Sequence, residues 1–202
     1  MGPDYHMEQR LGGPGGLVAG VDEVGRGPWA GPVTACAVVL DPLHIPDGLN
    51  DSKKLSEARR DALAVQILEV ADVSLGWASV EEIDAINIRQ ATFLAMTRAL
   101  SGLPRPPSHV LIDGNALPPG LPWPATCVIK GDSRSVSIAA ASIVAKVRRD
   151  TLMKELALMH PGYGWETNMG YGTVKHAAGL QHLGVTQHHR RSFTPIHKIL
   201  CG

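Results

Sequence analysis

LVAGVDEVGRGP, residues 17–28, carries the first clear structural pattern of the chain. Its first five residues are apolar and predict a short buried strand that ends at Asp22 and Glu23. A glycine-rich turn follows, and the β-branched, apolar run VTACAVVL at residues 33–40 predicts a second strand. The two strands predict a hairpin or meander, with two acidic residues where the first strand ends.

Strand-like and helix-like segments follow in a mixed order. Ser56, for example, offers the hydroxyl oxygen of an N-cap at the start of a helical stretch. We predict further strands over residues 73–80, 109–112 and 125–129, and helices over residues 56–70, 81–100, 132–159 and 173–184. This order predicts an α/β fold, with a mixed sheet flanked by helices.

The length and composition fit one compact domain. The chain has 202 residues, 44% hydrophobic and 19% charged, and no uncharged run reaches the roughly 20 apolar residues of a membrane helix. Residues 1–16 lack the apolar block of a signal peptide and are expected to form a disordered leader or an expression remnant. Three cysteines without metal-ligand spacing favour a reduced, cytoplasmic protein.

The net charge of zero hides an asymmetry along the chain. Residues 1–129 hold 9 Lys and Arg against 15 Asp and Glu, whereas residues 130–202 hold 10 against 4. Two interpretations stay open. The split is either a solvated surface with an uneven distribution, or an acidic metal site that faces a basic surface for a polyanion.

Four acidic residues share one local setting. Asp22-Glu23, Asp113 and Asp132 each follow a predicted strand, directly or after a two-residue turn. Such residues can converge at one sheet edge, where their mutual repulsion calls for a cation, and carboxylate oxygens select Mg²⁺ or Mn²⁺. Two such ions would suit phosphodiester hydrolysis. Taken singly, each acid is equally a cap or turn residue, and Glu23 can act through its side chain or its backbone.

Gly25-Arg26-Gly27 places backbone without side-chain bulk beside the first two acids. Glycines allow main-chain groups to approach a ligand closely, and an arginine can pair with a phosphate. The same pattern also suits a plain turn.

Eight blocks of the sequence resemble, in order, the motifs of the ribonuclease HII family, and they span nearly all of residues 17–198. The blocks are VDEVGRGP (21–28), DSKKLS (51–56), NIRQAT (87–92), IDGN (112–115), KGD (130–132), SIVAKV (142–147) with Arg149-Asp150, GYGT (170–173) and HHRRSF (188–193).

This resemblance implies a ribonuclease H-like fold, with a catalytic domain over residues 17–160 and a helical C-terminal extension over residues 161–202 that completes the substrate groove. It implies an endonuclease that cleaves the RNA strand of RNA–DNA hybrids and incises 5′ of single ribonucleotides in duplex DNA, as ribonucleotide excision repair requires. The products would carry 3′-hydroxyl and 5′-phosphate ends. A monomer without membrane contact is expected.

The resemblance also assigns roles by motif position. The catalytic and metal-binding acids would be Asp22, Glu23, Asp113 and Asp132, serving two Mg²⁺ or Mn²⁺ ions, with Asp150 in support. The backbone of Gly25-Arg26-Gly27 would contact the ribonucleotide 2′-hydroxyl, and Tyr171 would pack on the neighbouring sugar. Met169 departs from the family pattern, in which a basic residue often precedes Gly-Tyr.

Other polar residues are candidates for substrate contact. Lys53 and Lys146 suit phosphate contact or support of the site, although solvated lysines are common. Asn87 and Gln90 lie three apart and therefore share a helix face, which can meet the substrate or simply face solvent. Residues 188–191 (HHRR) form a basic, phosphate-facing cluster with no assigned chemical role.

Four alternatives fit less well. A Holliday-junction resolvase or a ribonuclease HI-type enzyme would not explain Gly25-Arg26-Gly27 and Gly170-Tyr171-Gly172. Ribonuclease HIII would be expected to carry a further N-terminal domain. A non-catalytic nucleic-acid binding module gains nothing from clustered acids that face phosphates.

Overall fold

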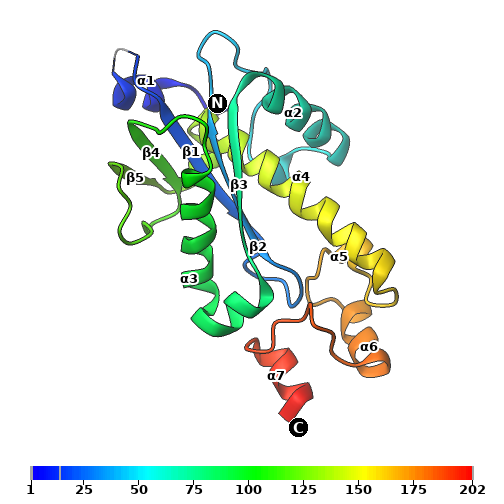
Figure 1. Ribbon diagram of the computed structural model, residues 1–202. Helices are drawn as coiled ribbons and strands as arrows, with labels where there is room; N and C mark the ends of the chain where they lie inside the picture. The colour runs from blue at the N-terminus through cyan, green and yellow to red at the C-terminus, as the bar shows by residue number, and fades with distance from the viewer. Residues whose placement is uncertain (1, 14, 202) are drawn as a thin grey trace.

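The computed structural model describes residues 2–13 and 15–201. A five-stranded sheet, in the order β3-β2-β1-β4-β5, forms its centre (Figure 1). The strands are β1 (Val18–Val24), β2 (Val33–Val39), β3 (Asp72–Ala78), β4 (His109–Asp113) and β5 (Ala125–Val128). β1 to β3 pair antiparallel, whereas β4 is parallel to β1 and β5 is parallel to β4. The predicted mixed sheet with flanking helices is confirmed.

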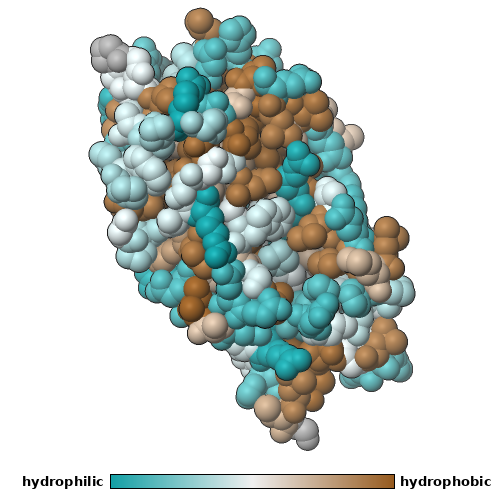
Figure 2. Space-filling model, in the orientation of Figure 1, coloured by the Kyte–Doolittle hydropathy of each residue, from teal (hydrophilic) through white to brown (hydrophobic). Residues whose placement is uncertain are grey.

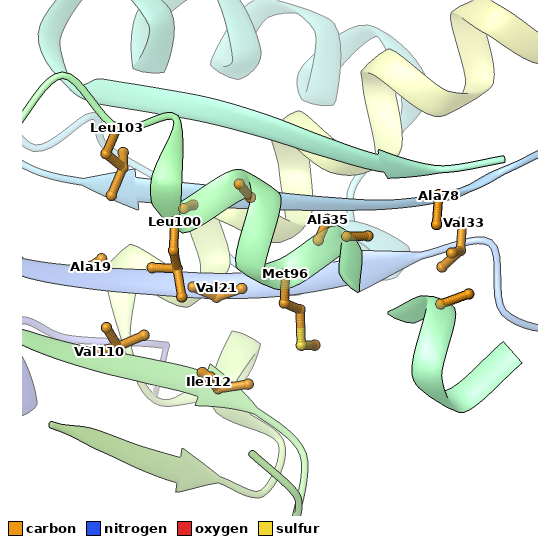
Figure 3. Packing of buried hydrophobic residues seen from close by; sticks show 14 of the residues in the cluster. Ala19, Val21, Val33, Ala35, Ala78, Met96, Leu100, Leu103, Val110 and Ile112 are labelled. Atoms are coloured by element: carbon orange, nitrogen blue, oxygen red, sulfur yellow. The ribbon is translucent and has the colours of Figure 1, made fainter. Parts of the chain in front are cut away.

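Helices cover both faces of this sheet. The helix α3 (Val80–Ser101) packs on one face, and α4 (Val136–Met159) with α2 (Glu57–Val70) packs on the other. On the α3 side, Met96 and Leu100 lie over apolar residues of β1 and β4 (Figure 3). β1 separates the two layers because its successive side chains point to opposite faces.

Gly20 allows α4 to approach β1 very closely. A Cβ atom at this position would lie 2.2 Å from the backbone carbon of Ser137 in α4. No residue with a side chain fits there, so glycine is needed at position 20 for the backbones of β1 and α4 to lie in contact. This contact places the first turn of α4 against β1.

Three short helices follow α4 and lie beyond the sheet (Figure 1). They are α5 (Trp165–Asn168), α6 (Val174–Leu183) and α7 (Thr194–Cys201). A separate apolar cluster that includes Ala30, Met153, Trp165 and Leu180 joins this extension to α4 and to the β1–β2 loop. The predicted helical extension at the C-terminus is confirmed.

The surface in Figure 2 mixes polar and apolar residues, and apolar ones gather over α2, where Val65 and Leu68 are exposed. Among the described residues, no helix combines the length and the apolar character needed to span a bilayer.

Residues 2–13 correct one expectation, because much of the leader is ordered. It forms α1 (His6–Gly12), and Glu8 is only 1% exposed. The Glu8 carboxylate accepts hydrogen bonds from the Ser135 hydroxyl, at 2.5 Å, and from the Ser137 backbone N–H, at 3.0 Å. The expectation of a disordered leader is therefore wrong for this segment, while residues 1 and 14 lie outside the described part.

Two helices also differ from the sequence-based expectation, one in its start and one in its continuity. Helix α4 begins after Ser135, whose hydroxyl accepts from the Ile138 N–H, so Asp132 is not its N-cap. Asp132 lies instead in a 3-10 turn, Gly131–Ser133. Helix α3 is interrupted at Asn87, where φ is 66° and ψ is 161°.

Candidate active site

The four predicted acids line one cavity of about 340 Å³ at the end of the sheet. Parallel pairing places Val21 of β1 opposite Ile112 of β4, so the residues that follow them, Asp22 and Asp113, emerge at the same edge. The 3-10 turn after β5 adds Asp132. The full lining is Asp22, Glu23, Val24, Ser52, Lys53, Asp113, Asp132, Ser142, Lys146 and Tyr171.

Asp22 is the most enclosed of the acids, with 7% of its surface exposed. One carboxylate oxygen accepts a hydrogen bond from the Glu23 N–H at 2.8 Å. Burial raises the pKa of Asp22 well above its ordinary value, and the negative charges of Glu23 and Asp113 raise it further; a hydrogen bond from Ser142 acts in the opposite direction. The site therefore holds more negative charge than its own residues neutralise.

Glu23 lies between the acidic cavity and a neighbouring one. The β1–β2 pairing continues without a bulge through Val24, so Glu23 follows Asp22 on a regular strand. It lines both the acidic cavity and a second cavity of about 310 Å³ beside α3. Burial raises the pKa of Glu23, whereas Arg26, whose Nη1 lies 3.3 Å from Oε1, lowers it.

Asp113 fixes the turn that carries Asp132. Its Oδ1 accepts a hydrogen bond from the Gly131 N–H at 2.6 Å, and Lys130 reverses the chain with a φ of 55°. Burial raises the pKa of Asp132, and the negative charges of Asp51 and Asp113 raise it further. The positive charge of Lys53 lowers it. The spacing of two acids that lie 19 positions apart in the chain is thus set by one short hydrogen bond.

The donor set fits a hard divalent cation that binds together with substrate. The cavity offers carboxylate and hydroxyl oxygens, which Mg²⁺ and Mn²⁺ prefer. In the described part of the chain, no three Asp, Glu, His or Cys side chains already form a metal-binding group. Mg²⁺ commonly uses one or two carboxylates, waters and substrate phosphates instead of a complete protein cage.

The two predicted lysines have different surroundings. Lys146 forms an ion pair with Asp150 at 2.8 Å, one helical turn away, so Asp150 orients a lysine of the cavity and does not line the cavity itself. Lys53 follows Ser52, whose hydroxyl lies 2.9 Å from that of Ser142. Neither serine was predicted, although both lie inside the motif blocks quoted above.

The predicted substrate-sensing residues lie beside one another, although only Tyr171 belongs to the lining of the acidic cavity. Tyr171 lines the acidic cavity and is 45% exposed. Gly27 faces its ring, since a Cβ at Gly27 would lie 3.3 Å from Cε1 of Tyr171. Gly25 has a φ of 90°, a conformation that disfavours other residues. The loop and the tyrosine, far apart in sequence, therefore meet beside the acids.

Asn87 and Gln90 do not share a continuous helical face, because α3 is interrupted at Asn87. The Asn87 side-chain oxygen instead accepts hydrogen bonds from the N–H groups of Arg89, at 3.0 Å, and Gln90, at 3.2 Å. Both predicted residues are exposed, and neither lines the two cavities described above. Arg89, which was not predicted, lines the neighbouring cavity.

The basic cluster at residues 188–191 is also different from the expectation. His189 and Arg190 are completely buried, so they do not face a phosphate in solution.

Comparisons with known proteins match the whole of this architecture. The model of a family described as Ribonuclease HII matches residues 19–196. The chain is 84% identical to ribonuclease HII of Jannaschia sp. strain CCS1 over 202 residues, covering all of both chains. The leader is therefore shared with that relative and is not an expression remnant. Ribonuclease HII of Ruegeria pomeroyi is 62% identical over 199 residues, which are 98% of this chain and 85% of that one.

Solved structures show the same fold. Ribonuclease H2 from Pyrococcus horikoshii OT3 superposes with a TM-score of 0.76 at 27% identity, over 91% of this chain and 96% of that one. A structure of Bst-RNase HIII in complex with Mn²⁺ gives a TM-score of 0.73 at 23% identity, over 95% of this chain and 71% of that one.

Proposed function

This chain belongs to the ribonuclease HII family and has ribonuclease H activity, and on that premise we propose that it also incises 5′ of single ribonucleotides embedded in duplex DNA. The RNA strand of RNA–DNA hybrids is its other substrate, and both reactions leave 3′-hydroxyl and 5′-phosphate ends. The observation that carries the proposal is the cavity in which Asp22, Glu23, Asp113 and Asp132 meet Tyr171.

Asp22, Asp113 and Asp132, with Glu23 beside them, would hold two divalent ions, Mg²⁺ or Mn²⁺. When bound, such ions polarise the phosphate, lower the pKa of bound water and stabilise the leaving oxygen. The Mn²⁺ complex of the ribonuclease HIII neighbour supports this choice. The protein's own part is to keep the carboxylates at fixed spacing through the Asp113–Gly131 hydrogen bond. It also orients Lys146, a lysine of the cavity, through the ion pair with Asp150.

Selection of the ribonucleotide rests on the Gly25-Arg26-Gly27 loop and Tyr171. Main-chain groups of the loop would contact the 2′-hydroxyl, which distinguishes RNA from DNA. The Tyr171 ring would pack on the next sugar, where an extra hydroxyl is not accommodated. Lys53 and Arg26 would contact the backbone phosphates, since each places positive charge at the rim of the acids.

We further propose that residues 17–160 act as the catalytic domain and residues 161–202 as the extension that completes the substrate groove. Tyr171 supports this division, because the extension supplies it to a cavity whose other lining residues all come from residues 17–160. The enzyme would act as a monomer in the cytoplasm, in the removal of ribonucleotides from DNA.

Nicking of a labelled DNA duplex that contains one ribonucleotide tests the proposal. We expect cleavage 5′ of the ribonucleotide with Mg²⁺ or Mn²⁺, none with EDTA, and at least about a 100-fold lower rate for Asp113→Asn. Asparagine keeps the oxygen that accepts from Gly131, so the fold should persist. Asp47→Asn, at an exposed acid outside the cavity, is the control.

Cleavage of long hybrids alone would remove the proposed role of Gly25-Arg26-Gly27 and Tyr171. Full activity of Asp113→Asn would remove the metal-binding assignment.

A further inference from the structure

The HHRRSF block at residues 188–193 has no role in the function described so far, yet it contains two fully buried basic residues. Arg190 and His189 have no exposed surface. The next residues anchor the block to α3: the Asp84 carboxylate accepts from the N–H groups of Arg191 and Ser192, each at 2.9 Å. Phe193 lies against the Arg190 guanidinium, with 5.0 Å from Cζ to the ring centre.

The Arg190 side chain binds the loop that follows β1. Its guanidinium donates to three backbone carbonyls: Gly25 at 2.5 Å, Arg26 at 2.9 Å and Gly31 at 2.9 Å. Burial and the nearby Arg149 lower the pKa of Arg190 to about 9, which leaves it charged at neutral pH. A buried charge that is solvated by carbonyl dipoles holds those carbonyls in one direction.

The backbone of the same block pairs with the loop. The Gly31 N–H donates to the His188 carbonyl at 2.9 Å, and the Arg190 N–H donates to the Trp29 carbonyl at 2.8 Å. Within the described residues, the N–H groups of Arg26 and Gly27 have no hydrogen-bond acceptor. The block thus occupies the carbonyls of Gly25, Arg26, Trp29 and Gly31, and it leaves the amides of Arg26 and Gly27 free for a ligand.

His189 extends this connection to Tyr171 through a second histidine. The Thr186 N–H donates to Nδ1 of His189, so the proton of His189 lies on Nε2, which is 3.0 Å from Nε2 of His176. Nε2 of His176 also accepts from Trp165, at 3.1 Å. Because Nε2 of His176 acts as an acceptor, the proton of the neutral His176 ring lies on Nδ1. This N–H donates to the Tyr171 carbonyl, at 3.0 Å.

We propose that His189 and Arg190 are positioning residues that hold the Gly25-Arg26-Gly27 loop and Tyr171 in a fixed mutual relation, and thereby set the preference for a single embedded ribonucleotide over a long hybrid. The proposal rests on the substrate roles given above to the loop and to Tyr171. Neither positioning residue touches the substrate.

The two substrates depend differently on this relation. A duplex with one ribonucleotide offers a single register in which the loop meets a 2′-hydroxyl and Tyr171 meets a deoxyribose. A long hybrid offers a 2′-hydroxyl in every register, and Tyr171 meets no deoxyribose within it. If the Gly25-Arg26-Gly27 loop and Tyr171 are no longer held in a fixed relation, cleavage at the single ribonucleotide therefore falls more than cleavage of the hybrid.

Arg190→Lys tests this directly, because lysine keeps the charge but cannot bind three carbonyls in the geometry of a guanidinium. We expect the ratio of kcat/KM on the single-ribonucleotide duplex to that on a long hybrid to fall about tenfold. Arg191→Lys, at the exposed neighbour, should leave the ratio unchanged. Leu63→Ala, at a buried core position of α2, should lower the Tm without changing the ratio.

His189→Asn provides a second variant if Arg190→Lys does not fold. Asparagine keeps an acceptor for the Thr186 N–H but loses the donor to His176, so the ratio should fall in the same direction and by less.

A double-mutant cycle with Tyr171→Ala separates positioning from general stability. If Arg190 acts through the loop and Tyr171, the double variant should lose little more selectivity than the larger single effect. Equal losses on both substrates, or fully additive losses of selectivity, would overturn the proposal. Failure of the wild type to cut the single ribonucleotide is a different result, because it removes the proposed function itself.

Discussion

A negative charge on Asp22 is costly in free energy, because the side chain is buried beside two further acids and its pKa is raised. We therefore expect Asp22→Asn to raise the Tm of the metal-free protein by about 2–4 °C, which corresponds to ~1 kcal/mol in a chain of this length. Asparagine can still accept from the Glu23 N–H and meet the Ser142 hydroxyl. The same variant should lose its nuclease activity.

The pH dependence of this gain has a definite sign. The folded pKa of Asp22 lies above that of the unfolded chain, near 3.9, so the folded state binds more protons between the two values. Stability is lost as the pH rises through this window, and the advantage of Asp22→Asn should shrink as the pH falls towards about 4. Thermal melts in EDTA from pH 4 to 8 measure the Tm difference between Asp22→Asn and the wild type, with Asp47→Asn as the control. A Tm difference that stays the same at all pH values would contradict this prediction.

Gly25 and Gly27 should respond differently to alanine. Gly25 has a φ of 90° and a Cβ there would lie 2.1 Å from Nε of Arg149, so Gly25→Ala should lose about 2 kcal/mol or more of stability. Gly27→Ala meets only the Tyr171 ring, at 3.3 Å, so it should fold normally but cut the single-ribonucleotide duplex about tenfold more slowly. Equal melting temperatures of Gly25→Ala and Gly27→Ala would contradict the expected difference in stability.

Secondary-structure elements were largely predictable where a local pattern determines them. The apolar runs predicted all five strands, and Ser56 caps α2 as expected, accepting from the Arg59 N–H. Parallel strands end at one edge, which is why the convergence of Asp22 and Asp113 could be predicted. The interruption of α3 was not predictable, because residues 81–100 read as one amphipathic segment and Asn87 carries no signal that separates a kink from a surface position.

Asn87 should act as the internal cap of α3. Asn87→Ala removes the acceptor for two N–H groups and should cost about 1–2 kcal/mol, whereas Asn87→Gly should cost less because glycine adopts the positive φ readily. Urea unfolding measures both, with the exposed Gln90→Ala as a near-neutral control. If kcat/KM of the folded Asn87→Gly variant fell strongly, the original assignment of Asn87 to substrate contact would be preferred over this capping role.

At the scale of the whole molecule, sequence reasoning missed the buried charges whose partners lie far away in sequence. Arg190 meets the carbonyl of Gly25, 165 positions before it, and Glu8 meets Ser135, 127 positions after it. Local patterns describe charged residues as solvated, since only the folded topology shows that a buried charge has hydrogen-bond partners. The resemblance to the ribonuclease HII motifs included Arg190 in one block, but it did not indicate what the side chain does.

Glu8 therefore decides whether α1 is part of the folded unit. Its carboxylate accepts two hydrogen bonds at the start of α4, just after the turn that carries Asp132, so Glu8→Ala should cost about 1.5–3 kcal/mol and lower the Tm by roughly 4–10 °C. Nuclease activity at low temperature should fall less, since the acids keep their own contacts. Gln9→Ala, exposed on the same helix, isolates the effect of burial from that of helix propensity. Equal melting temperatures for the two variants would show that α1 does not contribute to the stability of the catalytic unit.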